Sequence, residues 1–382
     1  MAARHVDVLL IGGGVASARC ARTLRRQGFT GSILLVSEED LPPYNRPPLS
    51  KELLREDLPT DLVLAEPMSW YDRREVELAL SSPVVAFDPE ARTATIADGA
   101  VVGFGQMLLA TGAEPRRPPF PGAERARLLR TLADAITLRE AAVAGARAVV
   151  VGGGFIGVEV ASSLAARGLG VTVVERTPAL WAGSLGERLS AWAVERLAAA
   201  DVTARLSTPV SSIGPEGVAL EGEVLPADLV LAGVGVEPRV GLAQEAGLEV
   251  DDGVLVDAGQ LTSARGIFAA GDMARPRNGV RVEHWHAARE SGERAALAML
   301  GLDVPAPRAP WIFSEVAGVT VDVVGVATDW DDALVRGGVH AYLAGGRVVQ
   351  VAVIDGAVEV EAARRLVEEE GTAQQLAALL AG

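Results

Sequence analysis

The stretch LLIGGGVASARCARTLRRQG, residues 9–28, decides the fold, because the chain repeats its pattern as VVVGGGFIGVEVASSLAARG over residues 149–168. Each copy is a short apolar run that leads into three glycines and then into a segment rich in small residues. This order predicts a buried strand, a tight turn and a helix. Such a turn lets the backbone approach a pyrophosphate, and the helix N-terminus offers it free N–H groups. Glycine turns also occur for packing reasons alone, so the pattern needs a second element.

A second apolar strand after each copy supplies that element. The runs ILLVSEED (residues 33–40) and VTVVERTP (residues 171–178) contain Glu38 and Glu175. Each acid lies roughly 20 residues beyond its glycines, where a carboxylate hydrogen-bonds the hydroxyls of a nucleotide ribose. Two such fingerprints predict two dinucleotide sites in one chain.

The two copies differ at the third glycine of the motif. In chain order the three positions are Gly12, Gly14 and Ser17 in the first copy, and Gly152, Gly154 and Gly157 in the second. A serine is small enough for a helix to pack closely on its strand, so we expect both copies to fold alike. The predicted fold class is α/β, with two Rossmann-like dinucleotide-binding domains.

The composition indicates a globular chain and excludes several kinds of partner. The 382 residues are 49% hydrophobic, and the formal net charge is −15. Such a charge repels nucleic acid and anionic lipid, because both are polyanions. The apolar run near the N-terminus is too short for a signal peptide or a membrane span, so we expect a cytoplasmic protein. The single cysteine, Cys20, cannot form an internal disulfide and is expected to be a buried small residue.

The basic residues are almost all arginines. The 35 basic residues include one lysine, Lys51. A compact ammonium with a tunable pKa differs chemically from a planar guanidinium. Lys51 is therefore a candidate for a specific role, and the alternative is an ordinary surface lysine.

A third element indicates which nucleotides bind. The run TSARGIFAAGDMA, residues 262–274, is an apolar strand that ends in Gly-Asp, and LLATGAEP, residues 108–115, is a strand that stops at a Thr-Gly turn. Asp272 at such a strand end can bind a polyol, and FAD has a ribityl chain whereas NAD has none. The alternative is an aspartate that caps a helix. These elements favour FAD in the first module and NAD in the second.

Together these motifs resemble the FAD-dependent NAD(P)H ferredoxin reductases of the putidaredoxin reductase and oxygenase-coupled type, within the pyridine nucleotide-disulfide oxidoreductase superfamily. The most specific marker is PPYNRPPLSKELL, residues 42–54, and further matches are LLRTLADA, residues 128–135, and GVGVEP, residues 233–238. The resemblance covers nearly the whole chain. It implies a glutathione reductase-like fold with a small α+β C-terminal domain.

The resemblance also implies a domain layout. It places a discontinuous FAD-binding domain at residues 1–114 and 236–302, an NAD-binding domain at 115–235, and a C-terminal interface domain at 303–382. The alternating strands VTVDVVGV, VHAYLAG and RVVQVAVID, followed by helical EVEAARRLVEEE, agree with the last of these.

The functional residues follow from the same resemblance. Lys51 and Glu159 are expected to form the catalytic pair beside the flavin. The expected cofactor-binding residues are Gly12, Gly14, Ala16, Glu38, Lys51, Val84, Arg130, Asp272, Trp285, Gly152, Gly154, Gly157, Glu175 and Gly235. The helix of VEHWHAARESGERAA, residues 282–296, is expected to start near Ala287. Its N-terminus would stabilise negative charge on a reduced flavin.

The nucleotide chemistry is expected to be hydride transfer from NADH to FAD, which needs alignment of two rings and no protein nucleophile. Glu175 favours NADH over NADPH, because a carboxylate binds a free 2′-hydroxyl and repels a 2′-phosphate. Arg176 beside it weakens this preference. His284 and His286 have no cysteine or histidine cluster near them, so we expect no metal site.

The electrons are expected to leave the flavin directly. Related disulfide reductases use a cysteine pair and related oxidases use one cysteine beside the flavin, but here Pro-Pro-Leu-Ser-Lys stands in that place. The expected acceptor is therefore a ferredoxin-type iron–sulfur protein that takes single electrons. One segment departs from the family pattern: PWIFSEVAG, residues 310–318, has Phe313 for a tryptophan and Glu315-Val316 for Asp-Gln, which puts the docking surface in doubt.

Two other functions stay open from the sequence. One is an NADH-dependent reductase of a small acceptor such as a quinone or dioxygen. The other is a redox-sensing flavoprotein like apoptosis-inducing factor, in which NADH changes assembly. The sequence leaves open a monomer or a homodimer.

Overall fold

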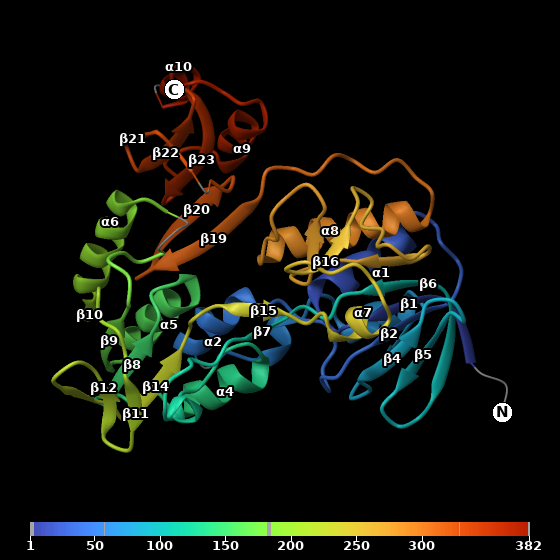
Figure 1. Ribbon diagram of the computed structural model, residues 1–382, viewed down its shortest axis with the longest axis horizontal. Coiled ribbons are helices and arrows are strands. Elements are labelled where there is room, and N and C mark those ends of the chain that lie inside the picture. Colours follow the sequence, from blue (N-terminus) through green and yellow to red (C-terminus); the bar gives the residue numbers. More distant parts are fainter. Residues whose placement is uncertain (1–3, 57, 182–184, 328, 381–382) are drawn as a thin grey trace. The chain divides into compact units, whose positions relative to one another are not determined.

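The computed structural model describes residues 4–56, 58–181, 185–327 and 329–380. The chain divides into two compact units (Figure 1). Unit 1 comprises residues 1–45, 59–114 and 237–307, and unit 2 comprises residues 46–58, 115–236 and 308–382. The segment that contains Lys51 therefore belongs to unit 2. The three-domain layout drawn from the sequence stays a prediction.

Unit 1 is built on a sheet with the strand order β3-β2-β1-β6-β5-β4, to which β17 adds beside β6. Its strands are β1 (Arg4–Ile11), β2 (Ile33–Val36), β3 (Val76–Ala79), β4 (Val84–Asp88), β5 (Thr93–Ile96), β6 (Val101–Leu109) and β17 (Ile267–Ala269). β1 pairs in parallel with both β2 and β6. The sequence prediction of a buried strand before the first glycine turn is confirmed, because residues 8–11 are all buried.

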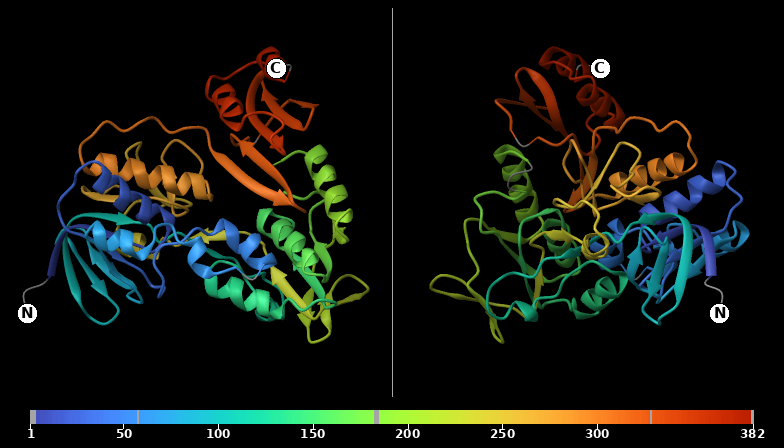
Figure 2. Two further views of the ribbon diagram at one scale, coloured as in Figure 1. Left: turned by 180° about the vertical axis from the view of Figure 1, so that it is seen from behind. Right: turned by 45° about the vertical axis from the view of Figure 1, so that its right-hand side comes forward.

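Successive side chains of β1 enter two different cores. Leu9 and Ile11 pack with one cluster and Val8 and Leu10 with the other, as the alternation of a strand requires. The helices α1 (Val15–Arg26) and α8 (Trp285–Met299) lie side by side against the sheet (Figure 2). The remaining elements of unit 1 are η2 (Thr60–Val63), α3 (Met68–Arg73), α7 (Gly241–Glu245), β16 (Val254–Val256) and β18 (Ala274–Pro276).

Unit 2 contains a parallel sheet with the order β10-β9-β8-β14. The strands are β8 (Arg147–Val151), β9 (Gly170–Val174), β10 (Val202–Arg205) and β14 (Leu229–Ala232), and the main helices are α4 (Leu132–Ala141), α5 (Phe155–Ala166) and α6 (Glu187–Ala198). Smaller elements are η1 (Pro47–Ser50), α2 (Glu52–Arg55), η3 (Ala123–Arg125), β11 (Ser212–Gly214), β12 (Gly217–Ala219) and β13 (Val224–Pro226). Strands β7 (Ala113–Pro115) and β15 (Val236–Pro238) span the unit boundaries.

The C-terminal part of unit 2 is a five-stranded antiparallel sheet with the order β19-β20-β23-β22-β21. Its elements are β19 (Trp311–Val316), β20 (Val319–Val324), β21 (Asp332–Arg336), β22 (Val339–Ala344), β23 (Arg347–Ile354), α9 (Val360–Glu368) and α10 (Ala373–Leu379). The predicted α+β module is confirmed.

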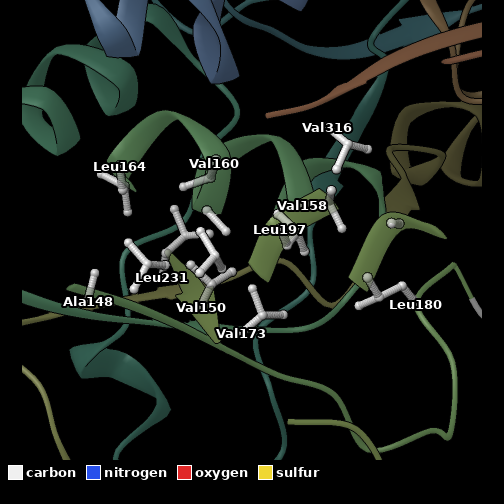
Figure 3. Packing of buried hydrophobic residues seen from close by; sticks show 14 of the residues in the cluster. Ala148, Val150, Val158, Val160, Leu164, Val173, Leu180, Leu197, Leu231 and Val316 are labelled. Atoms are coloured by element: carbon white, nitrogen blue, oxygen red, sulfur yellow. The ribbon is translucent and has the colours of Figure 1, made fainter. Parts of the chain in front are cut away.

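One hydrophobic core joins the parallel sheet of unit 2 to the C-terminal sheet. Figure 3 shows Val150, Val173 and Leu231 from the parallel strands beneath Val158 of α5, with Val316 of β19 close by. Burial of these branched side chains contributes about 25 cal/mol for each Å² of apolar surface removed from water. The core therefore fixes β19 against α5, and this contact positions the site described next.

Among the residues that the structure describes, no helix combines the length and apolar character needed to cross a bilayer.

Candidate functional site

The glycine loop of unit 2 joins β8 to α5 and has one crowded side and one open side. A Cβ on Gly152, whose φ is +107°, would lie 2.3 Å from the carbonyl oxygen of Gly233. A Cβ on Gly157 would lie 2.0 Å from the carbonyl oxygen of Gly152. Among the described residues, a Cβ on Gly154 would meet nothing closer than 3.9 Å, and Gly154 is the N-cap residue of α5. The crowded glycines fix the turn, and the open one leaves a helix N-terminus that an anion can approach.

Glu175 directly follows β9 and reaches this loop. Its Oε2 accepts the N–H of Gly153 at 2.7 Å, while its Oε1 accepts the N–H of Thr177 at 2.8 Å and the hydroxyl of Thr177 at 2.7 Å. Three donors hold the carboxylate at the edge of the glycine turn. The sequence predicted Glu175 but missed Thr177. The signal that could have identified Thr177 is its position two residues after an acid at a strand end.

The first glycine loop, in unit 1, has a crowded first glycine and an open second one, as the loop of unit 2 does. Gly12 has φ +116°, and a Cβ on it would lie 2.2 Å from the carbonyl oxygen of Ala110. Gly14 is the N-cap residue of α1, and a Cβ there would meet nothing within 4 Å in the described part of the chain. Ala16 is buried under α8, because a Cβ on Gly292 would lie 2.2 Å from the Ala16 oxygen. This module therefore has a second close approach, between the helices α1 and α8.

Glu38 is not the positional equivalent of Glu175. The residue directly after β2 is Ser37, which lies against Gly13 as Glu175 lies against Gly153. Glu38 is one residue further along the chain and forms an ion pair with Arg239, with about half of its side chain exposed. The assignment of Glu38 to a ribose stays a prediction.

Asp272 follows Gly271 at the end of β17. A Cβ on Gly271 would lie 3.4 Å from the Cβ of Ala16, and the Gly271 N–H donates to Ser291 of α8 at 3.0 Å. The Gly-Asp element therefore lies at the start of α1, beside the first glycine loop. This arrangement agrees with the sequence prediction that both elements serve one site.

Trp285 begins α8, so the prediction of a helix that starts near Ala287 is confirmed to within two residues. The helix starts earlier because the His284 side chain accepts the N–H of His286 and caps it. The Trp285 indole Nε1 donates to Asn45 Oδ1 at 2.7 Å, and the Arg289 guanidinium lies 4.3 Å from the centre of its ring. The indole therefore has a partner at its N–H group and a cation over its ring.

The catalytic pair expected from the sequence comes together in unit 2. The Lys51 Nζ lies 2.8 Å from Glu159 Oε2, and only 9% and 4% of the two side chains are exposed. Lys51 follows η1, and Glu159 lies on the second turn of α5. Charges this deeply buried need both each other and further hydrogen bonds.

Two serines supply those hydrogen bonds. The Ser50 hydroxyl donates to Glu159 Oε2, and the Ser314 hydroxyl donates to Glu159 Oε1 at 2.7 Å. The Lys51 ammonium also donates to the carbonyl oxygen of Pro47 at 3.3 Å. Sequence reasoning missed Ser50 and Ser314, because a serine shows its role only when the carboxylate it serves is packed beside it.

The divergent segment PWIFSEVAG forms β19 and borders this pair. The Lys51 Nζ lies 5.6 Å from the centre of the Phe313 ring, within cation–π range. Glu315 forms an ion pair with Arg55 of α2, and the Ala317 N–H donates to Ser162 of α5 at 3.1 Å. Phe313 and Glu315, two of the three replaced residues, therefore have partners within unit 2.

Three further predicted cofactor residues are placed as follows. Val84 starts β4 and is partly exposed. Arg130 precedes the capping box of α4, where its N–H donates to Asp134 at 3.0 Å. Gly235 is exposed and has φ +96°, a conformation that favours glycine. Their roles stay predictions.

Over the described ranges no group of three or more histidine, cysteine, aspartate or glutamate side chains is arranged to hold a metal ion.

Known proteins share this organisation. Residues 6–292 match the family model of pyridine nucleotide-disulphide oxidoreductases, and residues 311–380 match that of the reductase C-terminal domain. The ferredoxin–NAD(+) reductase component of the p-cumate 2,3-dioxygenase system of Pseudomonas putida is 33% identical, over 96% of this chain and 94% of its own length. The rubredoxin-NAD(+) reductase of the same organism is 35% identical, over 86% and 89%. The covalent putidaredoxin reductase–putidaredoxin complex matches with a TM-score of 0.92 at 29% identity, over 96% of this chain and 93% of that chain.

Proposed function

Because the chain belongs to the pyridine nucleotide-disulphide oxidoreductase family, we propose that it takes a hydride from NADH onto FAD and passes electrons singly to a ferredoxin-type iron–sulfur protein of an oxygenase or P450 system. The observation that carries this proposal is the buried Lys51–Glu159 pair, made from the one lysine of the chain. FAD would supply the conversion between two-electron and one-electron chemistry. The protein would supply binding, orientation and a fixed charge.

The residues that would hold FAD are those of unit 1. The open N-terminus of α1 at Gly14 offers N–H groups to a pyrophosphate. Asp272, which follows β17 and lies beside the start of α1, would bind the ribityl hydroxyls, and Trp285 would contact the ring system. Glu38 would bind the ribose, for which it must exchange the salt bridge to Arg239.

The residues that would hold NADH are those of the second glycine loop. The N-terminus of α5 at Gly154 would bind the pyrophosphate, and Glu175 would accept hydrogen bonds from the adenosine ribose. Gly153 and Thr177 orient the carboxylate for this contact. A 2′-phosphate would meet a fixed negative charge, which supports NADH as the preferred donor.

Lys51 would act as the fixed positive charge near the reacting ring. Ser50 and Ser314 both donate to Glu159, so the carboxylate stays oriented toward the ammonium. Burial keeps water away from the pair, so the field of its dipole is screened less at a nearby developing charge than it would be at the protein surface.

The exit of electrons would not involve a thiol. The chain has one cysteine, Cys20, which is completely buried, and burial raises the pKa of its thiol. A protonated buried thiol cannot relay reducing equivalents to a disulfide. This supports direct transfer to an iron–sulfur acceptor.

A cluster of arginines supports an acidic partner despite the net negative charge. Arg19 and Arg22 of α1 lie near Arg289 of α8, and burial together with these two arginines lowers the pKa of the Arg289 guanidinium. Glu293 pairs with Arg19 and Arg26, and Glu66 pairs with Arg22. Four positive and two negative charges leave a local excess that would steer an acidic ferredoxin.

The surface is testable apart from the chemistry. Replacing both Arg22 and Arg26 by serine should raise KM for an acidic ferredoxin, most strongly at low salt, and leave the rate of flavin reduction unchanged. Arg73→Ser, an exposed change on α3, is the matched control. If the double variant has the same KM for ferredoxin as the parent, the partner does not dock on this arginine cluster.

The central experiment measures flavin reduction by NADH in a stopped-flow instrument, followed by cytochrome c reduction through added ferredoxin. The double variant Lys51→Met with Glu159→Gln removes both buried charges together. Neither charge is then left buried without its partner, so we expect the variant to fold. We expect flavin reduction to slow by at least about tenfold. Arg147→Met, which removes an exposed cation paired with Asp228, is the control. Normal flavin reduction in the double variant would contradict the role of Lys51.

The same assays separate the two other functions. Rapid turnover with a quinone or dioxygen and none with ferredoxin would indicate a small-acceptor reductase. Slow turnover with a long-lived charge-transfer absorbance and a change of size on adding NADH would indicate a redox sensor.

A further inference from the structure

β21 is a terminal strand of the C-terminal sheet and carries apolar side chains on both of its faces. The strand order leaves it beyond β22 (Figure 1), and its residues read DALVR. Leu334 and Val335 are 37% and 40% exposed, although adjacent residues of a strand point to opposite faces. An uncovered edge with such side chains is a template for another strand.

The turn after β21 shows which backbone groups point to the free edge. Gly337 and Gly338 have φ of +57° and +80° and form a two-residue turn, and Arg336 pairs with Val339 across it. In this hairpin geometry every second residue, counting back from Arg336, bonds to β22. Ala333 and Val335 therefore direct their N–H and C=O groups outward. The Ala333 N–H, which donates to the Asp332 carboxylate at 2.8 Å instead of to β22, agrees with this.

The charges of β21 lie at its two ends and are opposite. Asp332 begins the strand and Arg336 ends it, and both side chains are exposed. Neither forms an ion pair with another residue in the described part of the chain. An antiparallel copy of the strand would bring the opposite charge to each end, so the edge is complementary to itself.

We propose that β21 pairs antiparallel with β21 of a second copy of this chain, about a two-fold axis at Leu334. Ala333 then lies opposite Val335 of the second copy, and the outward N–H and C=O groups of these residues bond to each other. Asp332 lies opposite Arg336 of the second copy at both ends. Its carboxylate gives up the Ala333 N–H to the new strand and takes the guanidinium in its place.

The register follows from the same residues. A shift of two residues places either Asp332 or Arg336 opposite Leu334 and loses both ion pairs. A shift of one residue turns the bonding groups away from each other. The contact is isologous and closes on itself, so it yields a dimer and no fibre. One five-residue strand buries less surface than stable interfaces do, and the dimer is therefore weak and concentration-dependent.

The test is sedimentation velocity of the full, flavin-loaded chain between about 10 µM and about 1 mM, where a weak dimer dissociates measurably. We expect a monomer–dimer equilibrium. Asp332→Arg or Arg336→Asp alone creates two like-charge contacts per dimer and should weaken dimerisation by about tenfold. The double variant Asp332→Arg with Arg336→Asp restores the opposite pairs and should return the dissociation constant to within about threefold of the parent.

Controls separate this contact from general charge effects and from misfolding. Glu216→Arg, an exposed reversal at the β11–β12 turn, should leave the equilibrium unchanged. NADH oxidation by every variant should equal that of the parent, because the two charges lie outside the proposed cofactor sites. A chain that is monomeric throughout the concentration range, or a dimer that neither single reversal weakens, would overturn the proposal. So would a double variant as weak as the single ones.

Discussion

The two glycine modules begin alike and differ at the seventh residue after the first glycine. In α5 this residue is Glu159, buried and bonded to Lys51 and two serines. In α1 it is Arg19, which is 20% exposed and pairs with Glu293 of α8. The same helix position thus serves an interior charge network in one module and a surface charge cluster in the other. A shared fold fixes where a side chain points, and its neighbours decide what it does.

The modules also place their tightest contact differently. In unit 2 the third glycine, Gly157, touches the turn itself, whereas in unit 1 its place is taken by Ser17 and the tight contact moves to Gly292 against Ala16. Ser17 is fully buried, and its hydroxyl has no hydrogen-bond partner among the residues that the structure describes. The first module therefore tolerates a side chain at a position where the second does not.

The largest expected effect breaks the comparison at the seventh residue. Glu159→Ala leaves the Lys51 ammonium buried without its carboxylate and should lower the free energy of unfolding by about 3–5 kcal/mol. Arg19→Ala, at the matching position, should cost less than about 1 kcal/mol, because a partly exposed ion pair contributes little. Urea denaturation of both variants, followed by far-UV circular dichroism, measures the difference. Equal losses in the free energy of unfolding would contradict this prediction, because they would mean that the buried and the partly exposed ion pair stabilise the protein equally.

The next effect concerns the third glycine position. Gly157→Ala forces a Cβ onto the Gly152 oxygen and should destabilise the protein by about 2–3 kcal/mol. Ser17→Ala is the control and should be neutral or slightly stabilising, since it removes an unpaired buried hydroxyl. Melting temperatures report both changes. A melting temperature of Gly157→Ala equal to the parent's would show that the loop relaxes.

A smaller effect distinguishes Glu175 in the second module from Glu38 in the first. Glu175→Ala should narrow the preference for NADH over NADPH by about tenfold, because it removes a ribose acceptor and a charge that repels phosphate. Thr177→Val, which removes one donor to that carboxylate, should shift the same ratio less. Glu38→Ala should leave the ratio unchanged. The measurement is kcat/KM with each nucleotide, and a parent enzyme that already prefers NADPH would refute the assignment.

The smallest effect is a pH dependence in the first module. Burial raises the pKa of the Glu293 carboxyl, but hydrogen bonds from Arg19 and Arg26 outweigh it and hold the pKa below its ordinary value of 4.5. The stabilisation is therefore complete above that pH and is lost as the pH falls below it. Thermal melts between about pH 3 and pH 6 should show a shallower decline for Glu293→Gln than for the parent. If the melting temperatures of the parent and of Glu293→Gln decline equally with falling pH, Glu293 does not contribute to this pH dependence.

The sequence predicted more of the backbone than of the charge network. Short apolar runs that end at glycines identify β1 and β8, because a strand buried on both faces of a parallel sheet is nearly all apolar, and the small residues after them identify α1 and α5. The sequence predicts the start of α8 to within two residues, but it does not predict the His284 cap, because that cap depends on a ring orientation that the pattern does not encode. Ser50, Ser314 and Thr177 were missed for the same reason.

What the sequence by itself determined is the duplicated strand–turn–helix plan, the family, the absence of a cysteine pair and the solitary lysine, since each is a matter of residue order and number. Only the tertiary structure decided that Ser50 and Ser314 converge on Glu159, that Glu315 is tied to Arg55, and that β21 is left at an open edge. The physical reason is that hydrogen bonds and ion pairs act over a few ångströms. Segments as distant in the chain as residues 50, 159 and 314 reach that range only when the hydrophobic core packs β19 against α5.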